Sequence, residues 1–201
     1  MGQIKTLLFD LGNVLAYIDF NEFWRSLGLV RPEEIAPFAD GYKSWTRQYE
    51  TGFISTSEYL SGLQSVFGRR FNVKQLKQAF ENIIQEPVDG MLDIVKHVSQ
   101  EHRTALVSDT NEIHYRLSLK KLVVLSILQK HYLSYQLRVM KPARGFYDAI
   151  IKDQKIDPSE MLLIDDLITN VNGAQAAGMQ AIKFENPAKL EKTLKDLGVL
   201  L

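Results

Sequence analysis

Residues 6–15 read Thr-Leu-Leu-Phe-Asp-Leu-Gly-Asn-Val-Leu, and this stretch is the first indication of the fold of the chain. The run is apolar until it meets an acid at Asp10. Two later apolar runs end in the same way, in hydroxyl or acidic residues: Ser108 with Asp109, and Asp165 with Asp166. Short, continuous apolar runs are typical of strands that are buried on both faces, as in a parallel sheet.

Helical patterns separate these strands. Apolar residues at helical spacing precede the second run at residues 94–98 and the third at residues 146–151, and residues 180–184 read as another strand. Alternation of strand and helix favours an α/β fold with a doubly wound, parallel-sheet, Rossmann-like core. Because ligands bind beyond the carboxyl ends of such strands, the acids that follow the three runs should meet at one edge of the sheet.

A long stretch after the first strand breaks this alternation. It contains no convincing strand and reads as roughly four helices. A capping box at Ser55 to Glu58 opens one helix, and Asn72 can cap the next, whose apolar spacing runs as far as Ile84. We therefore expect a helical-bundle cap inserted into the α/β core: residues 16–86 form the cap, and residues 1–15 and 87–201 form the core.

Two segments of the predicted core are less regular. Residues 122–128 are apolar throughout and could form a helix or a strand, because periodicity does not distinguish the two in a short apolar run. Residues 131–134 read as a short strand ahead of Lys141.

The composition excludes several classes of protein. The 201 residues are 45% hydrophobic and 24% charged, which is typical of one globular domain or of a core with a small appendage. The 24 basic residues equal the 24 acidic ones in number, so no net charge would attract nucleic acid or an anionic membrane. The chain has no cysteine, which excludes disulfides, thiol nucleophiles and thiolate metal sites. No stretch is long and apolar enough for a signal peptide or a membrane span, and we expect a cytoplasmic protein, a monomer or weak dimer.

The residues at the strand ends indicate a kind of chemistry. Clustered carboxylates repel one another unless a cation lies among them, and oxygen ligands favour Mg²⁺. Lys141, held extended by Pro142, could pair with both a carboxylate and a phosphate at the same edge. An acid pair, a hydroxyl group, a lysine and a metal ion together suit phosphoryl transfer. Of the four histidines, only His114 is expected near this pocket.

Four motifs lie in order at residues 9–15, 107–111 and 140–142, and at residues 163–166 together with Asn170. They resemble the motifs of the haloacid dehalogenase (HAD) superfamily, whose members are hydrolases with an aspartate nucleophile. The motifs cover essentially the whole chain, and the helical insertion falls where that family places its cap. The first motif, Asp-Leu-Gly-Asn-Val, and the sequence Glu-Thr-Gly-Phe-Ile in the cap look closest to the branch of small sugar-phosphate phosphatases.

The resemblance implies a role for each motif. Asp10 would attack phosphorus and form a phosphoaspartate, which splits one difficult displacement into two easier ones. Lys141 would stabilise Asp10 and the incoming charge. The residues implied in phosphate binding are Ser108, Asp109, Lys141, Gly12 and Asn13. The implied Mg²⁺ ligands are Asp10, the carbonyl of Gly12, Asp165 and Asp166.

One position departs from the family pattern. Phosphatases of this family usually carry a second Asp two residues after the nucleophile, where it protonates the leaving group and later activates water. This chain has Gly12 there. General acid–base catalysis is typically worth about 10²–10⁴-fold, so turnover would be slow, restricted to good leaving groups or supported by another acid. The two candidates for that substitute acid are Asp19 and Asp109.

The leading prediction is a Mg²⁺-dependent phosphatase that acts on a small phosphorylated metabolite, with a sugar phosphate as one candidate. One alternative is a catalytically impaired protein of the same fold that binds phosphate without turnover. A second alternative is a haloacid dehalogenase, which needs no metal and is disfavoured by the acid pair Asp165–Asp166. A third is a phospho-acceptor signalling domain, which would carry its acid pair after the first strand and would have no cap.

Overall fold

The computed structural model describes residues 3–200, so Met1, Gly2 and Leu201 at the ends of the predicted core lie outside the described residues. The core contains a five-stranded sheet in the order β5-β4-β1-β6-β7, and every neighbouring pair is parallel. The strands are β1 (Thr6–Phe9), β4 (Arg103–Ser108), β5 (Lys130–Leu133), β6 (Met161–Asp165) and β7 (Gln180–Lys183). The predicted doubly wound, Rossmann-like core is therefore confirmed.

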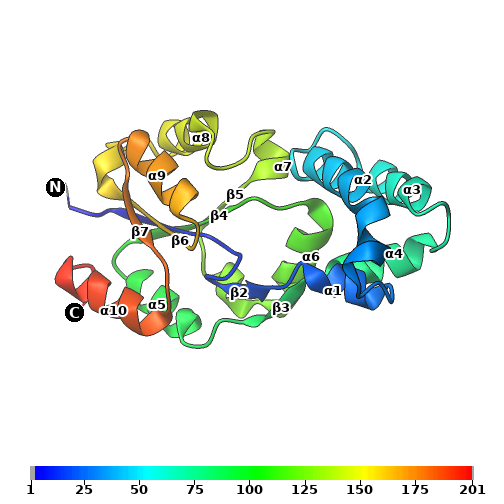
Figure 1. The fold of residues 1–201 in the computed structure, drawn as a ribbon. Coiled ribbons are helices and arrows are strands. Elements are labelled where there is room, and N and C mark those ends of the chain that lie inside the picture. The colour runs from blue at the N-terminus through cyan, green and yellow to red at the C-terminus, as the bar shows by residue number, and fades with distance from the viewer. Residues whose placement is uncertain (1–2, 201) are drawn as a thin grey trace.

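Helices cover both faces of this sheet (Figure 1). Side chains alternate along a strand, so Leu7 and Phe9 face one apolar cluster and Leu8 faces the other. The first cluster includes α5 (Met91–Val98) and α10 (Pro187–Asp196), and the second includes α8 (Arg144–Gln154) and α9 (Ile168–Ala176). This double cover explains why the central strands are continuous apolar runs.

The connections between the strands of the core carry four further elements. These are α6 (Glu112–Lys121), a 3₁₀ turn η1 (Val123–Ser126), α7 (Ser134–Leu137) and a second 3₁₀ turn η2 (Pro158–Glu160). Residues 122–128, for which the sequence left helix and strand open, form neither an α-helix nor a strand, because η1 occupies their centre. Within residues 3–200, none of the helices combines the length and the apolar character that crossing a membrane requires.

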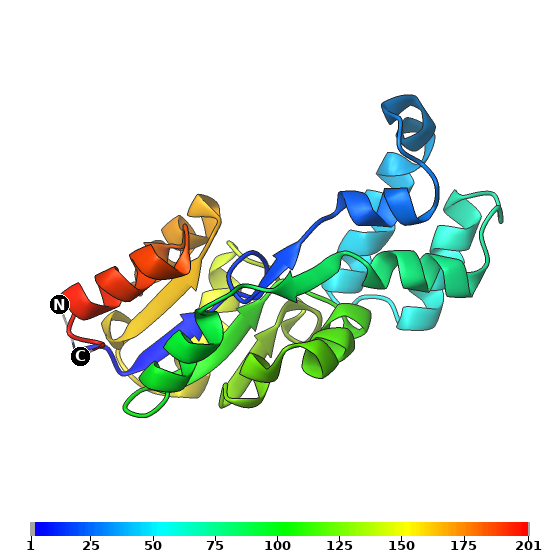
Figure 2. The same cartoon turned by 90° about the horizontal axis from the view of Figure 1, so that it is seen from below.

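The cap is a separate lobe of four helices, which Figures 1 and 2 show beside the carboxyl edge of the sheet. Both predicted helix N-caps are present: Ser55 Oγ accepts from the Glu58 N–H at 3.2 Å, and Asn72 Oδ1 accepts from the Gln75 N–H at 2.9 Å. The cap has an apolar core of its own, rich in aromatic rings. Its helices are α1 (Asn21–Ser26), α2 (Pro32–Glu50), α3 (Thr56–Val66) and α4 (Val73–Glu81).

Two short strands join the cap to the core, and here the sequence prediction was wrong. β2 (Ala16–Ile18) and β3 (Ile84–Pro87) pair antiparallel where the chain enters and leaves the cap. Ile84 therefore belongs to β3 and not to the helix that Asn72 opens. Each strand forms only by pairing with a segment on the far side of the cap sequence, so neither leaves a local periodicity to detect.

Candidate active site

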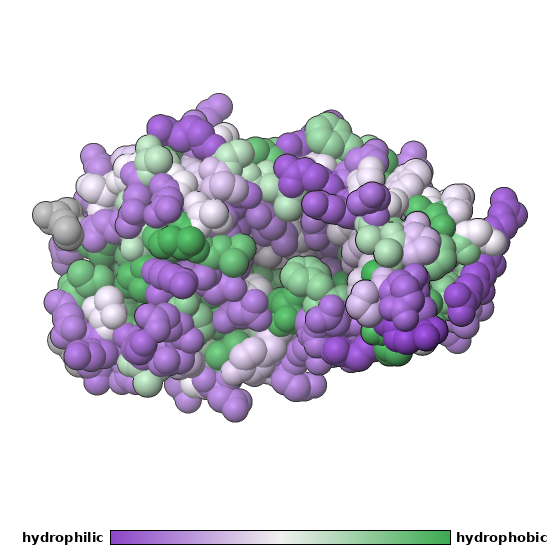
Figure 3. Space-filling view, viewed as in Figure 1, coloured by the Kyte–Doolittle hydropathy of each residue, from purple (hydrophilic) through white to green (hydrophobic). Residues whose placement is uncertain are grey.

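A cavity of about 200 Å³ lies between the carboxyl edge of the sheet and the cap. The space-filling view shows the surface hollowed between these two lobes (Figure 3). Asp10, Ser108 and Asp166 line the cavity from the core, and Phe20 and Glu50 line it from the cap. The strand ends that the sequence predicted to converge therefore do meet at one pocket.

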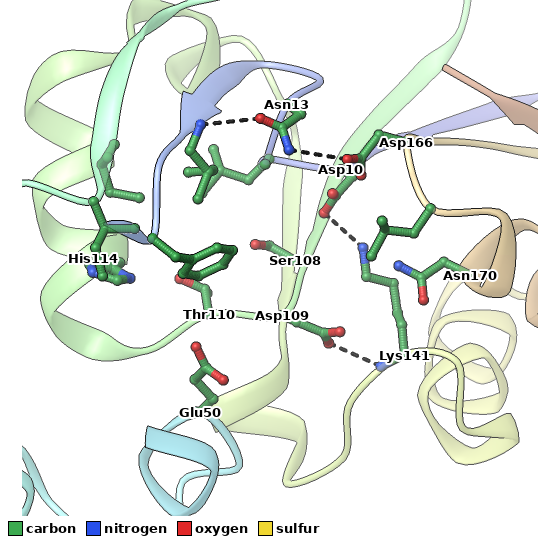
Figure 4. Close-up of a pocket in the computed structure, with 17 residues that line it drawn as sticks. Asp10, Asn13, Glu50, Ser108, Asp109, Thr110, His114, Lys141, Asp166 and Asn170 are labelled. Atoms are coloured by element: carbon green, nitrogen blue, oxygen red, sulfur yellow. Dashed lines mark hydrogen bonds and ion pairs between the residues drawn. The ribbon is translucent and has the colours of Figure 1, made fainter. Parts of the chain in front are cut away.

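Lys141 is buried between two carboxylates at the base of this pocket. Its Nζ donates to Asp10 Oδ1 and to Asp165 Oδ2, both at 2.7 Å. The Lys141 side chain is 1% exposed. Its backbone N–H donates to Asp109 Oδ1 at 3.0 Å, so three carboxyl groups from three strand ends surround one lysine (Figure 4). The cluster carries more negative than positive charge.

Burial and charge oppose each other in this cluster. Burial raises the pKa of Asp10, and the charge and hydrogen bond of Lys141 act against that rise. Burial alone would lower the pKa of Lys141, but the charges of Asp10, Asp165 and Asp109 outweigh it and raise the pKa well above its usual range. Lys141 is therefore a permanent cation, and a second cation near Asp10 would favour the carboxylate that attack on phosphorus requires.

Both oxygens of Asp165 are already engaged by the protein. Oδ1 accepts from the Leu167 N–H and from Asn170 Nδ2, each at 3.0 Å. Oδ2 accepts from Lys141 Nζ and, at 3.2 Å, from the same amide of Asn170. Asp165 thus fixes Lys141 and the start of α9 in place, which leaves the second member of the acid pair more available to a ligand.

Asp166 stands at the mouth of the cluster and is held by the loop after β1. Asn13 Nδ2 donates to Asp166 Oδ2 at 3.1 Å, and Asn13 Oδ1 accepts from the Ile18 N–H at 3.2 Å. Asn13 has a φ of 54°, a left-handed conformation that asparagine tolerates better than most residues. This turn connects the predicted nucleophile loop to the predicted metal-binding loop.

The acidic cluster fits a magnesium ion. Carboxylate oxygens of Asp10, Asp165 and Asp166 all lie within 4.8 Å of one another, and Gly12 lines the pocket beside them. Hard oxygen donors of this kind, together with an excess of negative charge, are what Mg²⁺ prefers. Asp10 and Asp166 are the side chains best placed to hold the ion, with the carbonyl of Gly12 as the backbone ligand implied by the sequence.

The end of β4 supplies polar groups opposite the acidic cluster. Ser108 is buried. The pocket is lined by Ser108, Asp109 and Thr110. The Thr110 N–H donates to Ser134 Oγ at 2.9 Å, which fixes the loop after the strand. Burial raises the pKa of Asp109, with Lys141 acting against the rise. Asp109 therefore holds a proton more readily than an exposed aspartate does.

The two candidates for the missing acid lie in different places. Asp109 lines the pocket, whereas Asp19 is outside its lining residues and pairs with Arg25 on the cap surface. The Asn21 backbone N–H and Arg25 hold the pKa of Asp19 below its usual range. A carboxyl group with a lowered pKa has lost its proton near neutral pH and has none to donate, so the structure favours Asp109 over Asp19 as the candidate for the substitute acid.

The cap contributes a carboxyl group for which the sequence suggested no role. Glu50, the last residue of α2, points into the pocket below Asp109 and Thr110 (Figure 4). Burial and the charge of Asp109, partly offset by Arg47, raise the pKa of Glu50 to about 8. The only sequence signal was its place in the Glu-Thr-Gly-Phe-Ile segment, which indicated a family and not a function.

His114 lines the pocket, as the sequence predicted, but its ring is already bonded. Nε2 lies 2.7 Å from the carbonyl oxygen of Phe80, and Nδ1 lies 3.1 Å from the amide of Asn111. Burial lowers the pKa of His114 to about 4, so the ring is neutral at physiological pH. The residue connects α6 of the core to α4 of the cap and adds no charge to the pocket.

Known proteins are similar to this chain in sequence and in fold. A family model described as haloacid dehalogenase-like hydrolase matches residues 39–184. A D-ribitol-5-phosphate phosphatase from Bacteroides thetaiotaomicron is 27% identical over 200 residues, which are 96% of this chain and 97% of that protein. The flavin mononucleotide hydrolase 1 of Arabidopsis thaliana is 27% identical over 152 residues, which are 76% of this chain and 61% of that protein.

Solved structures show the same architecture. A HAD family enzyme from Bacteroides thetaiotaomicron, determined in complex with magnesium and inorganic phosphate, has a TM-score of 0.80 and 28% identity. The alignment covers 91% of this chain and 95% of that one. The match of the family model over most of the chain, with four motifs in order at one pocket, shows that this chain belongs to the haloacid dehalogenase-like hydrolase family.

Proposed function

We propose that this protein is a Mg²⁺-dependent phosphatase that hydrolyses small phosphorylated metabolites through a phosphoaspartate at Asp10. The observation that carries the proposal is the contact of Lys141 with Asp10 at 2.7 Å, beside an acidic cluster at the carboxyl edge of the sheet. A carboxylate held by a buried lysine next to a cation site has the charge and the position that a nucleophile for phosphorus needs.

In the first step, an Asp10 oxygen bonds to phosphorus while the bond from phosphorus to the leaving-group oxygen breaks. Lys141 offsets the charge on the transferring group, and Ser108, with nearby backbone N–H groups, binds the phosphoryl oxygens. The Mg²⁺ held by Asp10, Asp166 and the Gly12 carbonyl would neutralise charge on the phosphoryl group. Catalysis of this kind depends mainly on position and charge, which this pocket supplies.

The proton that the leaving group needs comes from Asp109 in this proposal. Its Oδ1 accepts the Lys141 N–H, which leaves Oδ2 to carry a proton toward the pocket. Asp109 gives this proton to the leaving-group oxygen. In the second step, water attacks phosphorus and returns a proton to Asp109, the bond to Asp10 breaks, and inorganic phosphate and the Asp10 carboxylate result.

The cap shields this chemistry and selects the substrate. We place the boundaries of the cap at residues 16–86, with residues 1–15 and 87–201 as the core; the hydrogen-bonded ribbon of β2 and β3 supports this division. Two relatives named for phosphate-ester hydrolysis support the reaction class. A sugar or polyol phosphate is the substrate class that we favour.

The test measures phosphate release from p-nitrophenyl phosphate by the whole protein. We expect hydrolysis with Mg²⁺, loss of hydrolysis with EDTA, and a fall of at least about 10⁴-fold in kcat for Asp10→Asn. Asp93→Asn, at an exposed position on α5, is the matched control and should keep wild-type activity. Activity that survives Asp10→Asn, or that needs no divalent ion, would contradict the proposal.

Because Gly12 stands where the family usually has an acid, a second candidate function is binding of phosphate without turnover. A protein with this function would bind Mg²⁺ and phosphate but would release p-nitrophenol no faster than Asp10→Asn does. The same assay, combined with calorimetric titration of phosphate in the presence of Mg²⁺, separates the two functions.

A further inference from the structure

Glu50 is the one acidic side chain that the cap contributes to the lining of the pocket among the described residues. Its carboxyl group makes no hydrogen bond or ion pair with any residue between 3 and 200. Every other carboxyl group in the lining has a partner in the protein: Asp10, Asp109 and Asp166 accept from Lys141 or Asn13. An unpaired carboxyl group that faces a pocket is available to a ligand.

The backbone under Glu50 is fixed to the core. The Glu50 carbonyl accepts from Ser134 Oγ at 2.6 Å, and the phenol of Tyr49 accepts from the Ile113 N–H at 3.1 Å. Gly52 has a φ of 67°, and a Cβ there would lie 2.0 Å from the Tyr135 carbonyl oxygen, so the chain passes close to α7. Glu50 is thus held at a set place relative to the end of β4, which carries the phosphate-binding residues.

The surroundings of Glu50 do not suit an anion. Lys141 is the single basic side chain in the described lining, and it is already paired with Asp10 and Asp165. His114 is neutral, and Asp109 lies on the same side as Glu50 (Figure 4). Within the lining, a second phosphate or carboxylate on the substrate would meet two carboxyl groups and no unpaired cation. Arg47, whose charge acts on both Glu50 and Asp109, lies outside the lining.

The surroundings do suit a hydroxyl group. Burial keeps Glu50 protonated at neutral pH, and a carboxylic acid can both donate and accept a hydrogen bond, as a hydroxyl group can. Apolar side chains, including Ile18, Phe20 and Ile84, form another part of the lining and can pack against carbon atoms. The cavity volume of about 200 Å³ suits a small leaving group.

We infer that Glu50 is a specificity-determining residue that hydrogen-bonds a hydroxyl group of the leaving group, so that the enzyme selects phosphate monoesters of small, neutral polyols and sugars. This inference rests on the proposed phosphatase function. Glu50 takes no part in the bond changes at phosphorus.

The test compares two substrates with the same carbon chain, glycerol 1-phosphate and propyl phosphate, which lacks the hydroxyl groups. Wild-type enzyme should show a higher kcat/KM for glycerol phosphate. Glu50→Leu should lower the ratio of the two kcat/KM values by at least about tenfold, mostly through the KM of glycerol phosphate. Glu50→Gln should keep most of the ratio, because an amide also donates and accepts hydrogen bonds. If Glu50→Leu fails to fold, Glu50→Ala takes its place with the same expectation.

The matched controls are Glu33→Leu and Glu33→Gln, at an exposed position in the first turn of the same helix. Both should keep the wild-type ratio. A third substrate, 3-phosphoglycerate, has a carboxylate in place of the terminal hydroxymethyl group of glycerol phosphate. The wild-type kcat/KM for it should be at least about tenfold lower than for glycerol phosphate.

Three results would overturn the inference: a wild-type enzyme with no preference for glycerol phosphate, a Glu50→Leu ratio within about twofold of wild type, or phosphoglycerate used as well as glycerol phosphate. Equal losses of kcat on both substrates would also overturn it, because they would assign Glu50 to the chemistry or to folding. Failure of the proposed function looks different, since p-nitrophenyl phosphate would then not be hydrolysed in a manner that depends on Mg²⁺ and Asp10.

Discussion

The core side and the cap side of the pocket differ in how their ionisable side chains are paired. On the core side, Lys141 is buried against Asp10 and Asp165 at 2.7 Å, and every group is held by another. On the cap side, the Glu50 carboxyl group makes no hydrogen bond or ion pair with the described residues. His114, which belongs to α6 of the core and contacts the cap at Phe80, is neutral. This difference is what we expect if, as proposed, the core side binds the phosphoryl group that all substrates share and the cap side contacts the leaving group.

The largest effect is expected when the cation of the core side, Lys141, is removed. Lys141→Gln leaves Asp10 and Asp165 buried without a counter-charge, which typically costs about 3–5 kcal/mol. We expect a loss of that size in the free energy of unfolding, measured with urea, together with loss of phosphatase activity. Added Mg²⁺ should restore part of the stability.

The control for this variant is Lys130→Gln, which breaks the surface ion pair of Lys130 with Asp153. Exposed pairs contribute about 0–1 kcal/mol, so this variant should unfold nearly as the wild type does. Equal losses in the two variants would show that the buried cluster is no more important to stability than a surface pair.

The neutral state of His114, where α6 of the core contacts the cap, can be tested through the pH dependence of stability. His114 has its usual pKa of 6.5 when unfolded and a pKa of about 4 when folded. Between these values the unfolded chain binds a proton that the folded chain does not, so stability falls as pH falls below 6.5. From pH 7 to pH 5, wild type should lose about 2 kcal/mol more of its free energy of unfolding than His114→Gln.

Urea titrations at the two pH values measure this difference, and His97→Gln, at an exposed position on α5, is the control. That control should show the same pH dependence as wild type. A His114→Gln variant with an unchanged pH dependence would mean that the ring binds a proton as readily in the folded protein as in the unfolded chain, which would contradict the lowered pKa.

The core side could be predicted in detail because its residues follow buried strands directly. Asp10, Ser108 and Asp165 each end an apolar run, and parallel strands bring such ends together. Glu50 could not be assigned a role in this way, because its position depends on how the end of α2 docks against Ser134, a contact between residues 84 positions apart.

The β2–β3 ribbon was missed for the same kind of reason. Its strands are three and four residues long, and each has its partner on the other side of the cap sequence. Local patterns of hydrophobicity show which residues are buried within one element, and they contain no information on pairing across so long an insertion.

A smaller effect is expected from a substitution of Gly12, which lies where the two sides of the pocket meet. A Cβ on Gly12 would lie 3.2 Å from Ile18 Cγ1 and 3.9 Å from Asp10 Oδ2, so a side chain fits after a small shift of Ile18. Gly12→Asp should therefore raise kcat for an alkyl phosphate by about tenfold, since it adds an acid beside the nucleophile. Gly12→Asn, which has the same shape but no proton to give, should bring no gain. A Gly12→Asp enzyme no faster than wild type would show that Asp109 already supplies the proton in full.

The most direct test of the central claim, that Asp10 accepts the phosphoryl group beside Mg²⁺, uses beryllofluoride, which mimics a phosphoryl group on a carboxylate. Fluorine NMR of the wild-type protein should show a bound beryllofluoride signal that requires Mg²⁺, that disappears in Asp10→Asn and that persists in Asp93→Asn. A wild-type protein with no bound signal, a signal without Mg²⁺, or an unchanged signal in Asp10→Asn would contradict the account.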